Sequence, residues 1–162
     1  MIVRAGDLHP AGLKVDLAVH AGRLTWEPGT DIEVTGGRLT AHVRPARNGL
    51  ACSGQIVAET LIPCARCLSP YPLPVRREFD VRYVPPPRGD APEHVEVQVQ
   101  REDLDIAYLN EEGEFDVEGL ISEQIYLEIP MKPLCTPACR GLCPGCGSNL
   151  NNEDCRCPAS VV

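Results

Sequence analysis

The chain has 162 residues, of which 43% are hydrophobic and only 4% aromatic. This length suits one ordinary domain or two very small ones, and the apolar fraction excludes a disordered tail. The formal charge of −8 argues against a general polyanion binder, and no uncharged stretch exceeds 12 residues, so no transmembrane helix fits. Because the first residues lack the apolar core of a signal peptide, we expect a cytoplasmic protein whose nine cysteines stay reduced.

Most of the first two thirds of the chain is predicted to form β-strands. Residues 13–19 and 37–43 alternate apolar and polar side chains, and 50–60 and 73–84 are longer extended candidates. In the last of these, every second position is charged, as expected where one face of a sheet is buried. Breaks are predicted at 27–29, 35–37 and 48–49, and a stiff proline-rich connector at 85–89 precedes a short strand at 95–100.

One helix is expected near residues 116–129. Asp116 is suited to cap its first turn, and Pro130 stops it. The apolar residues that recur at helical spacing are Val117, Leu120, Ile121 and Ile125.

Eight of the nine cysteines follow spacings that are typical of metal ligands. A two-residue gap lets both sulfurs of a tight turn reach one tetrahedral ion. CPGCG at 143–147 has this form, with Gly147 free to take a positive φ, and CARC at 64–67 has the same gap. The candidate ligands are Cys64, Cys67, Cys135, Cys139, Cys143, Cys146, Cys155 and Cys157. The ninth, Cys52, lies in a predicted strand and is expected to be a small buried thiol.

Eight thiolates suffice for two zinc sites. The division that we prefer places the last four cysteines on one ion, and Cys64, Cys67, Cys135 and Cys139 on the other, which ties the tail to the β-rich part. Interleaved pairings, one zinc ion with spare thiols, and iron–sulfur ligation are alternatives. A closed four-cysteine site has no open coordination position, so we expect a structural metal rather than a redox or catalytic one.

These patterns predict an α+β, β-rich fold. Residues 1–130 form an antiparallel sheet or partial barrel with one main helix, and residues 131–162 form a zinc-knuckle module packed on it. No nucleophile elbow, phosphate loop or dinucleotide fingerprint is present, so we expect neither an enzyme nor a small-molecule substrate.

Charge is distributed unevenly along the chain. Residues 61–88 carry a net charge of +3, and residues 89–134 carry −11. The acidic stretch is either a solvated face or a docking surface for a basic partner.

Three motifs occur in a characteristic order. They are IPCARCLSP at 62–70, FDVEGLISEQIYLEIPMKPLC at 115–135 and CRGLCPGCGSNLNNEDCRC at 139–157. Their order resembles the bacterial YceD family, also described as the large ribosomal RNA subunit accumulation proteins, which has plant chloroplast relatives. The likeness covers roughly residues 50–157. The first 50 residues show no motif of the family and match it only in being predicted strands.

The resemblance implies a non-enzymatic factor that supports accumulation of large-subunit ribosomal RNA during ribosome assembly. Its partner is then a precursor of the large ribosomal subunit, through its rRNA or its ribosomal proteins, and its zinc is structural. Some members lack the cysteines, which implies that the metal is not the family's essential chemistry. Within the basic segment, the residues that we predict to contact RNA are Arg76, Arg77, Arg82 and Arg88.

Two other functions compete with this one. The first is an acidic adaptor that binds a basic protein partner. The second is a thiol redox or metal-dependent enzyme.

Overall fold

The computed structural model describes residues 1–25, 31–87, 106–155 and 157. Strands dominate these residues, with one α-helix, so the expected β-rich α+β class is confirmed. The elements are β1 (Ile2–Arg4), a 3-10 turn (Ala5–Asp7), β2 (Leu13–Val19), β3 (Gly22–Thr25), β4 (Asp31–Ala46), β5 (Gly49–Pro63), β6 (Pro70–Val84), β7 (Ile106–Tyr108), β8 (Glu114–Asp116) and α1 (Val117–Leu127). The turn predicted at 27–29 and the strand predicted at 95–100 lie outside the described residues.

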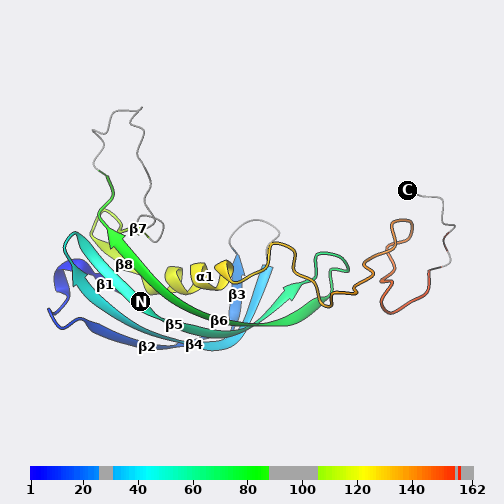
Figure 1. The fold of residues 1–162 in the computed structure, drawn as a ribbon, viewed down its shortest axis with the longest axis horizontal. Coiled ribbons are helices and arrows are strands. Elements are labelled where there is room, and N and C mark those ends of the chain that lie inside the picture. Colours follow the sequence, from blue (N-terminus) through cyan, green and yellow to red (C-terminus); the bar gives the residue numbers. More distant parts are fainter. Residues whose placement is uncertain (26–30, 88–105, 156, 158–162) are drawn as a thin grey trace.

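A six-stranded sheet is built around the long strands β4, β5 and β6 (Figure 1). Its strand order is β2-β4-β5-β6-β7, and β3 pairs with the other end of β4. All these pairs are antiparallel except β6–β7, which is parallel. In the described part of the chain β2 and β7 are opposite edges, so the sheet is open and no barrel is observed. The remaining strands, β1 and β8, form a separate two-stranded ribbon.

The break predicted at 35–37 is wrong. Strand β4 continues through these residues, and its register against β5 shifts between Val34 and Gly36. Such a bulge accommodates an extra residue and increases the local twist without ending the strand. The turn predicted at 48–49 is confirmed. Gly49 has a φ of 123° there, and an added Cβ atom would also collide with the carbonyl oxygen of Tyr83, so both features require glycine.

Strand β6 shows how the two faces of the sheet differ. Val75, Phe79 and Tyr83 are buried, whereas the charged residues between them at 76, 78, 80 and 82 are exposed. The predicted alternation is therefore confirmed. We call the face that carries the buried residues the inner face, and the opposite one the outer face.

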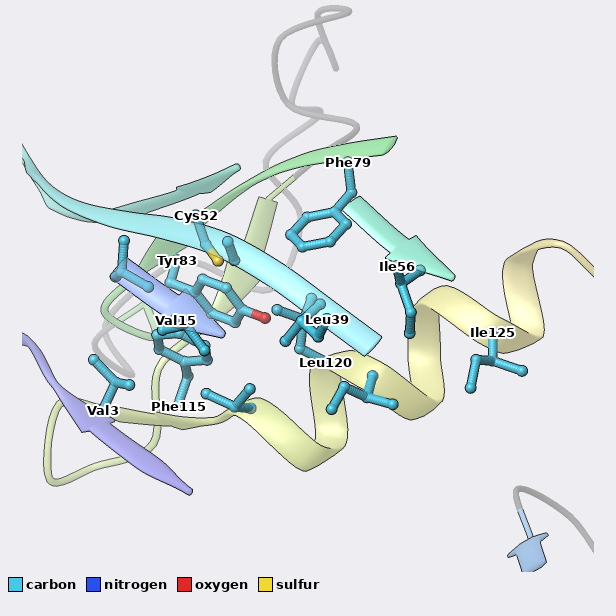
Figure 2. Close-up of a cluster of buried hydrophobic side chains, with 14 of the residues drawn as sticks. Val3, Val15, Leu39, Cys52, Ile56, Phe79, Tyr83, Phe115, Leu120 and Ile125 are labelled. Carbon is cyan, nitrogen blue, oxygen red and sulfur yellow. The ribbon is translucent and has the colours of Figure 1, made fainter. Parts of the chain in front are cut away.

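Helix α1 packs on the inner face and closes the core (Figures 1 and 2). As predicted, the Asp116 carboxylate caps it by accepting a hydrogen bond of 3.2 Å from the Glu118 N–H.

Tyr83 and Phe115 stack with ring centroids 4.2 Å apart, which joins β6 to β8. Cys52 is 1% exposed in this core, where burial raises its pKa to about 11, so it is the small buried thiol that was expected.

One polar contact fixes the helix against β6. Arg77 lies on the inner face, where its Nε donates to the Gln124 amide oxygen at 2.9 Å. Its other guanidinium nitrogen, Nη1, donates to the Glu128 carboxylate at 2.8 Å. Because Gln124 is only 2% exposed, this bond satisfies a polar group that is otherwise costly to bury.

A glycine near the centre of the sheet allows β4 and β5 to approach closely. Gly54 lies on the inner face, opposite Ala41 of β4 and Phe79 of β6. A Cβ atom added to Gly54 would collide with the Thr40 carbonyl oxygen and lie 2.8 Å from the Ala41 Cβ. The long strands bend around α1 in Figure 1, and this close approach of β4 and β5 accompanies the bend.

We therefore expect Gly54→Ala to lower the free energy of unfolding by roughly 1–3 kcal/mol, because the sheet must shift to admit the methyl group. Denaturant unfolding measures this change. Gly22→Ala is the matched control, since a Cβ there meets no atom within 4 Å, and it should change the stability by less than about 0.5 kcal/mol. Equal effects of the two substitutions would contradict this account of the close approach.

Candidate metal centre

The turn between β5 and β6 is a cysteine knuckle. The Cys64 N–H donates to the Ser69 carbonyl at 3.0 Å, and the Leu68 N–H donates to the Cys64 carbonyl at 2.9 Å. These bonds close a compact loop in which Cys64 and Cys67 are both buried. Leu68 takes a left-handed φ of 58° to leave the loop, although it is not a glycine.

The tail completes a group of four sulfurs at this turn, which we call the first tetrad. After α1 the chain passes beside the end of the β5–β6 hairpin, as Figure 1 shows. Cys135 and Cys139 lie there, with Sγ–Sγ distances of 3.7 Å from Cys67 to Cys135 and 3.7 Å from Cys64 to Cys139. The four Sγ atoms lie within 4.8 Å of one another.

A second knuckle repeats the hydrogen bonds of the first. The Cys143 N–H donates to the Ser148 carbonyl at 2.8 Å, and the Gly147 N–H donates to the Cys143 carbonyl at 2.9 Å. These bonds span the same residue offsets as those of the first knuckle. Gly147 has a φ of 74° at the position that corresponds to Leu68, which confirms the conformation expected for it.

The second tetrad consists of Cys143, Cys146, Cys155 and Cys157. The Cys155 sulfur lies 3.2 Å from that of Cys143 and 3.5 Å from that of Cys146. All four Sγ atoms again lie within 4.8 Å of one another. Cys146 and Cys157 are exposed, whereas three cysteines of the first tetrad are buried, so the second tetrad is the more open to solvent.

The donor set of each tetrad fits a tetrahedral metal ion. Bonds of about 2.3 Å from zinc to four sulfurs place those sulfurs about 3.8 Å apart in a regular tetrahedron. The sulfur contacts in the two tetrads, 3.2–3.7 Å, are close to this separation and much longer than a disulfide bond, and all nine cysteines are free thiols. Four sulfur ligands leave no coordination position for a substrate, so such an ion holds the chain together.

Hydrogen bonds lower the pKa of two thiols in each tetrad, Cys64 and Cys67 in the first and Cys143 and Cys146 in the second. Burial raises the pKa of Cys64, but hydrogen bonds from the backbone N–H groups of Cys135, Cys67 and Arg66 outweigh it and lower that pKa to about 6. A hydrogen bond from the Ser148 hydroxyl is the main cause that lowers the pKa of Cys146 to about 6. Thiolates stabilised in this way are the form that binds metal.

Two other thiols hold their protons more tightly. Burial is the main reason why the pKa of Cys135 rises to about 12. For Cys157, the main reason why the pKa rises to about 12 is a hydrogen bond shared with the Cys155 side chain. The sulfurs of each tetrad thus compete for protons. A divalent cation that binds there displaces those protons.

The two tetrads are joined through hydrogen bonds around the first knuckle. The Leu142 N–H donates to the Arg66 carbonyl at 3.2 Å, and the Arg66 guanidinium donates to the Cys139 carbonyl at 2.8 Å. From the second loop, the Asn149 amide donates to the Ser69 hydroxyl at 3.1 Å. The segment that carries the second tetrad is therefore folded against the first.

Asn151 is a functional candidate that the spacing of cysteines does not reveal. Its Nδ2 donates to the Cys139 sulfur at 3.3 Å, and its Oδ1 accepts from the Arg140 N–H at 2.8 Å. The backbone donor fixes the orientation of the amide, so its N–H must face the sulfur. The only sequence signal is a polar NLNN run between the knuckle and the last two cysteines.

Three of the four arginines predicted to contact RNA lie in the described part of the chain, and these three do not share one face of the sheet. Arg76 and Arg82 are exposed on the outer face of β6. Arg77 lies on the inner face, bonded to Gln124 and Glu128, and its position next to Arg76 in a strand dictates this opposite orientation. Arg88 lies outside the described residues.

Together, the fold and the site define a β-rich protein whose long β5–β6 hairpin ends in a cysteine knuckle that the C-terminal tail completes. The chain belongs to the YceD family, since the family described as large ribosomal RNA subunit accumulation protein YceD matches residues 52–162. Among the described residues, α1 is the longest helix, and none is long and apolar enough to cross a bilayer.

Curated relatives come from bacteria and from plants. Uncharacterized proteins of Mycobacterium tuberculosis and Mycobacterium bovis are 33% identical over 71% of this chain and 52% of their own length. A maize protein named large ribosomal RNA subunit accumulation protein YCED homolog 1, chloroplastic, is 26% identical over 74% of this chain and 47% of its own length. The chain thus spans about half the length of these relatives, and no solved structure matches it.

We expect Asn151→Asp to weaken metal binding at the first tetrad by about 10-fold or more, because a carboxylate oxygen replaces the N–H that faces the Cys139 thiolate. Competition with a colorimetric chelator measures this affinity. Asn152→Asp adds the same charge one residue further along, where the side chain is exposed, and should leave the affinity unchanged. Equal weakening by both variants would show that general negative charge is the cause.

Proposed function

We propose that this protein is a non-enzymatic factor that supports accumulation of large-subunit ribosomal RNA during ribosome assembly in the cytoplasm. The observation that carries the proposal is the family match over residues 52–162, which includes both cysteine knuckles and α1. The name of the maize relative points in the same direction. The proposed partner is a precursor of the large ribosomal subunit, bound through its rRNA or its ribosomal proteins.

The proposed metal is zinc, with one structural ion on each tetrad. Three features support it: four sulfur donors per site, spacings near those of a tetrahedron, and N–H groups directed at the sulfurs. We further propose that residues 131–162 form a module packed on the domain of residues 1–130. The backbone bond of 2.8 Å from the Ala65 N–H to the Pro133 carbonyl supports this packing.

The acidic adaptor is the weaker alternative, because part of the acidic segment serves the fold itself. In its described part, Glu114 pairs with Arg4 and Glu128 pairs with Arg77. Asp116 caps α1. These carboxylates are committed to contacts within the chain, so they contribute little to a docking surface for a basic protein.

Depletion and capture together test the proposed function. Depleting the protein in the cells that make it should lower the ratio of large-subunit to small-subunit rRNA. Capturing the tagged protein from the same cells should enrich large-subunit rRNA and large-subunit ribosomal proteins. An unchanged rRNA ratio, with capture of one free basic protein and no rRNA, would favour the adaptor instead.

A further inference from the structure

Basic residues from three strands and a turn meet at one end of the outer face. Arg44 of β4 and Arg82 of β6 both pair in register with Ala51 of β5, which lies between them. Lys14 of β2 pairs with His42, two residues from Arg44 on the same face. Arg47 is exposed in the β4–β5 turn that closes this end of the sheet. We call Lys14, Arg44, Arg47 and Arg82 the cationic cluster.

The pairing brings these side chains within reach of one ligand. Two strand spacings separate Arg44 from Arg82, which is about 10 Å between their Cα atoms. Lys14 and Arg44 are diagonal neighbours across a strand pair, about 7–8 Å apart. The side chain between the two arginines is only the methyl group of Ala51, so both guanidinium groups can turn toward the same object.

No member of the cluster forms an ion pair with another described residue. By contrast, Arg38, further along the same face, is held by two bonds of 2.7 and 2.6 Å to the Asp16 carboxylate. Two acids lie on the face near the cluster: Asp80, two residues from Arg82 in β6, and Asp16, two residues from Lys14 in β2, whose carboxylate is bonded to Arg38. Because Asp16 is already bonded to Arg38, Asp80 is the acid left to offset the four like charges, which repel one another, and a polyanion that binds there relieves this repulsion.

We propose that the cationic cluster binds the phosphate backbone of large-subunit rRNA, an inference that rests on the proposed function. Lysine and arginine side chains supply most contacts to nucleic-acid phosphates. Protein interfaces also use arginine as an anchor, but together with tryptophan and tyrosine side chains packed at the centre of the interface. Beside the cluster, the middle of the outer face presents small or polar side chains, Thr40, Ala51, Ser53 and Gln55, and the β7 edge presents one exposed aromatic ring, Tyr108, next to Arg82. Dense positive charge with a single ring beside it favours RNA over a protein partner.

These side chains also indicate what the cluster recognises. Sequence-specific binding of single strands depends on aromatic rings that stack on the bases. Salt-dependent contacts to phosphates carry no sequence information. The four cations of the cluster therefore hold the RNA by its backbone, and the exposed Tyr108 ring beside Arg82 is the described side chain placed to stack on a base.

The cluster is remote from the candidate metal centre. It lies near the β4–β5 turn, whereas the first tetrad lies at the opposite end of β5 (Figure 1). The 13 residue steps from Ala51 in β5 to Cys64 in its turn span roughly 40 Å of extended chain. Changes in the cluster should therefore leave metal binding intact, which makes the two features separable by experiment.

The test is binding of the full-length, metal-loaded chain to protein-free large-subunit rRNA transcript at several salt concentrations. Reversing two charges with Arg44→Glu and Arg82→Glu together should weaken binding at least about 10-fold near 0.1 M salt, because each lost phosphate contact also removes counterion release. The slope of log affinity against log salt should become shallower by about 1.4–1.8. The milder double variant, Arg44→Gln with Arg82→Gln, should change both quantities in the same direction.

The matched control reverses two charges elsewhere, with Lys132→Glu and Arg140→Glu, both exposed and far from the cluster. It should bind RNA like the parent. Unchanged metal content and melting temperature establish that each variant is folded. Equal loss of binding in the cluster and control variants, or an unchanged salt slope in the cluster variant, would overturn the proposal.

One further outcome separates the cluster from the proposed function. If the parent does not bind the free transcript, and capture from cells still enriches large-subunit precursors, the cluster proposal is wrong. The proposed function then stands, through contacts with ribosomal proteins. If neither the transcript nor the precursors are bound, both proposals fail.

Discussion

The structure of the C-terminal part depends on the first tetrad, in which four sulfurs come together at the β5–β6 turn. The small cluster of buried side chains there consists of Cys64, Cys67 and Cys139, with a few partly buried neighbours such as Tyr71 and Leu134. Such a cluster is too small to order a tail of this length by hydrophobic burial. In the proposed metal-bound form, an ion held by four thiolates would supply the missing free energy, because its binding energy would become folding energy.

The second tetrad depends on the first in this arrangement. Its loop contacts the first knuckle through the Asn149–Ser69 bond, and Asn151 donates directly to a sulfur of the first tetrad. Its own cysteines are more exposed, so it gains less from burial. Ordering therefore runs outward, from the core under α1, along the β5–β6 hairpin to the first tetrad, and from there to the second.

Local patterns were sufficient to predict the features that depend on neighbouring residues. Alternation in 73–84 predicted the buried face of β6, and Asp116 predicted the start of α1, because both follow from backbone geometry over a few residues. The preferred division of eight cysteines matches the two groups that the structure brings together, whereas the spacing alone had left interleaved pairings open, and metal binding stays a prediction. The same alternation also places Arg77 on the inner face, a signal that the RNA prediction overlooked.

Features that depend on long-range pairing could not be predicted. The cationic cluster combines Lys14, Arg44 and Arg82, which are far apart in the chain and meet only through the register of β2, β4, β5 and β6. Two of these come from the electrically neutral first 60 residues, where composition gives no hint of a basic surface. The bulge in β4 was mistaken for a break because glycine favours both.

Metal content combined with hydrogen exchange tests the central claim, that metal on the cysteines orders the tail against the sheet. The purified full-length chain should contain two zinc ions. Chelation should remove protection from amides in residues 135–155, while amides in β4, β5 and β6 keep theirs, because the sheet has its own core under α1. A chain that contains no metal under anaerobic conditions, or a tail that stays protected after its metal is removed, would contradict the account.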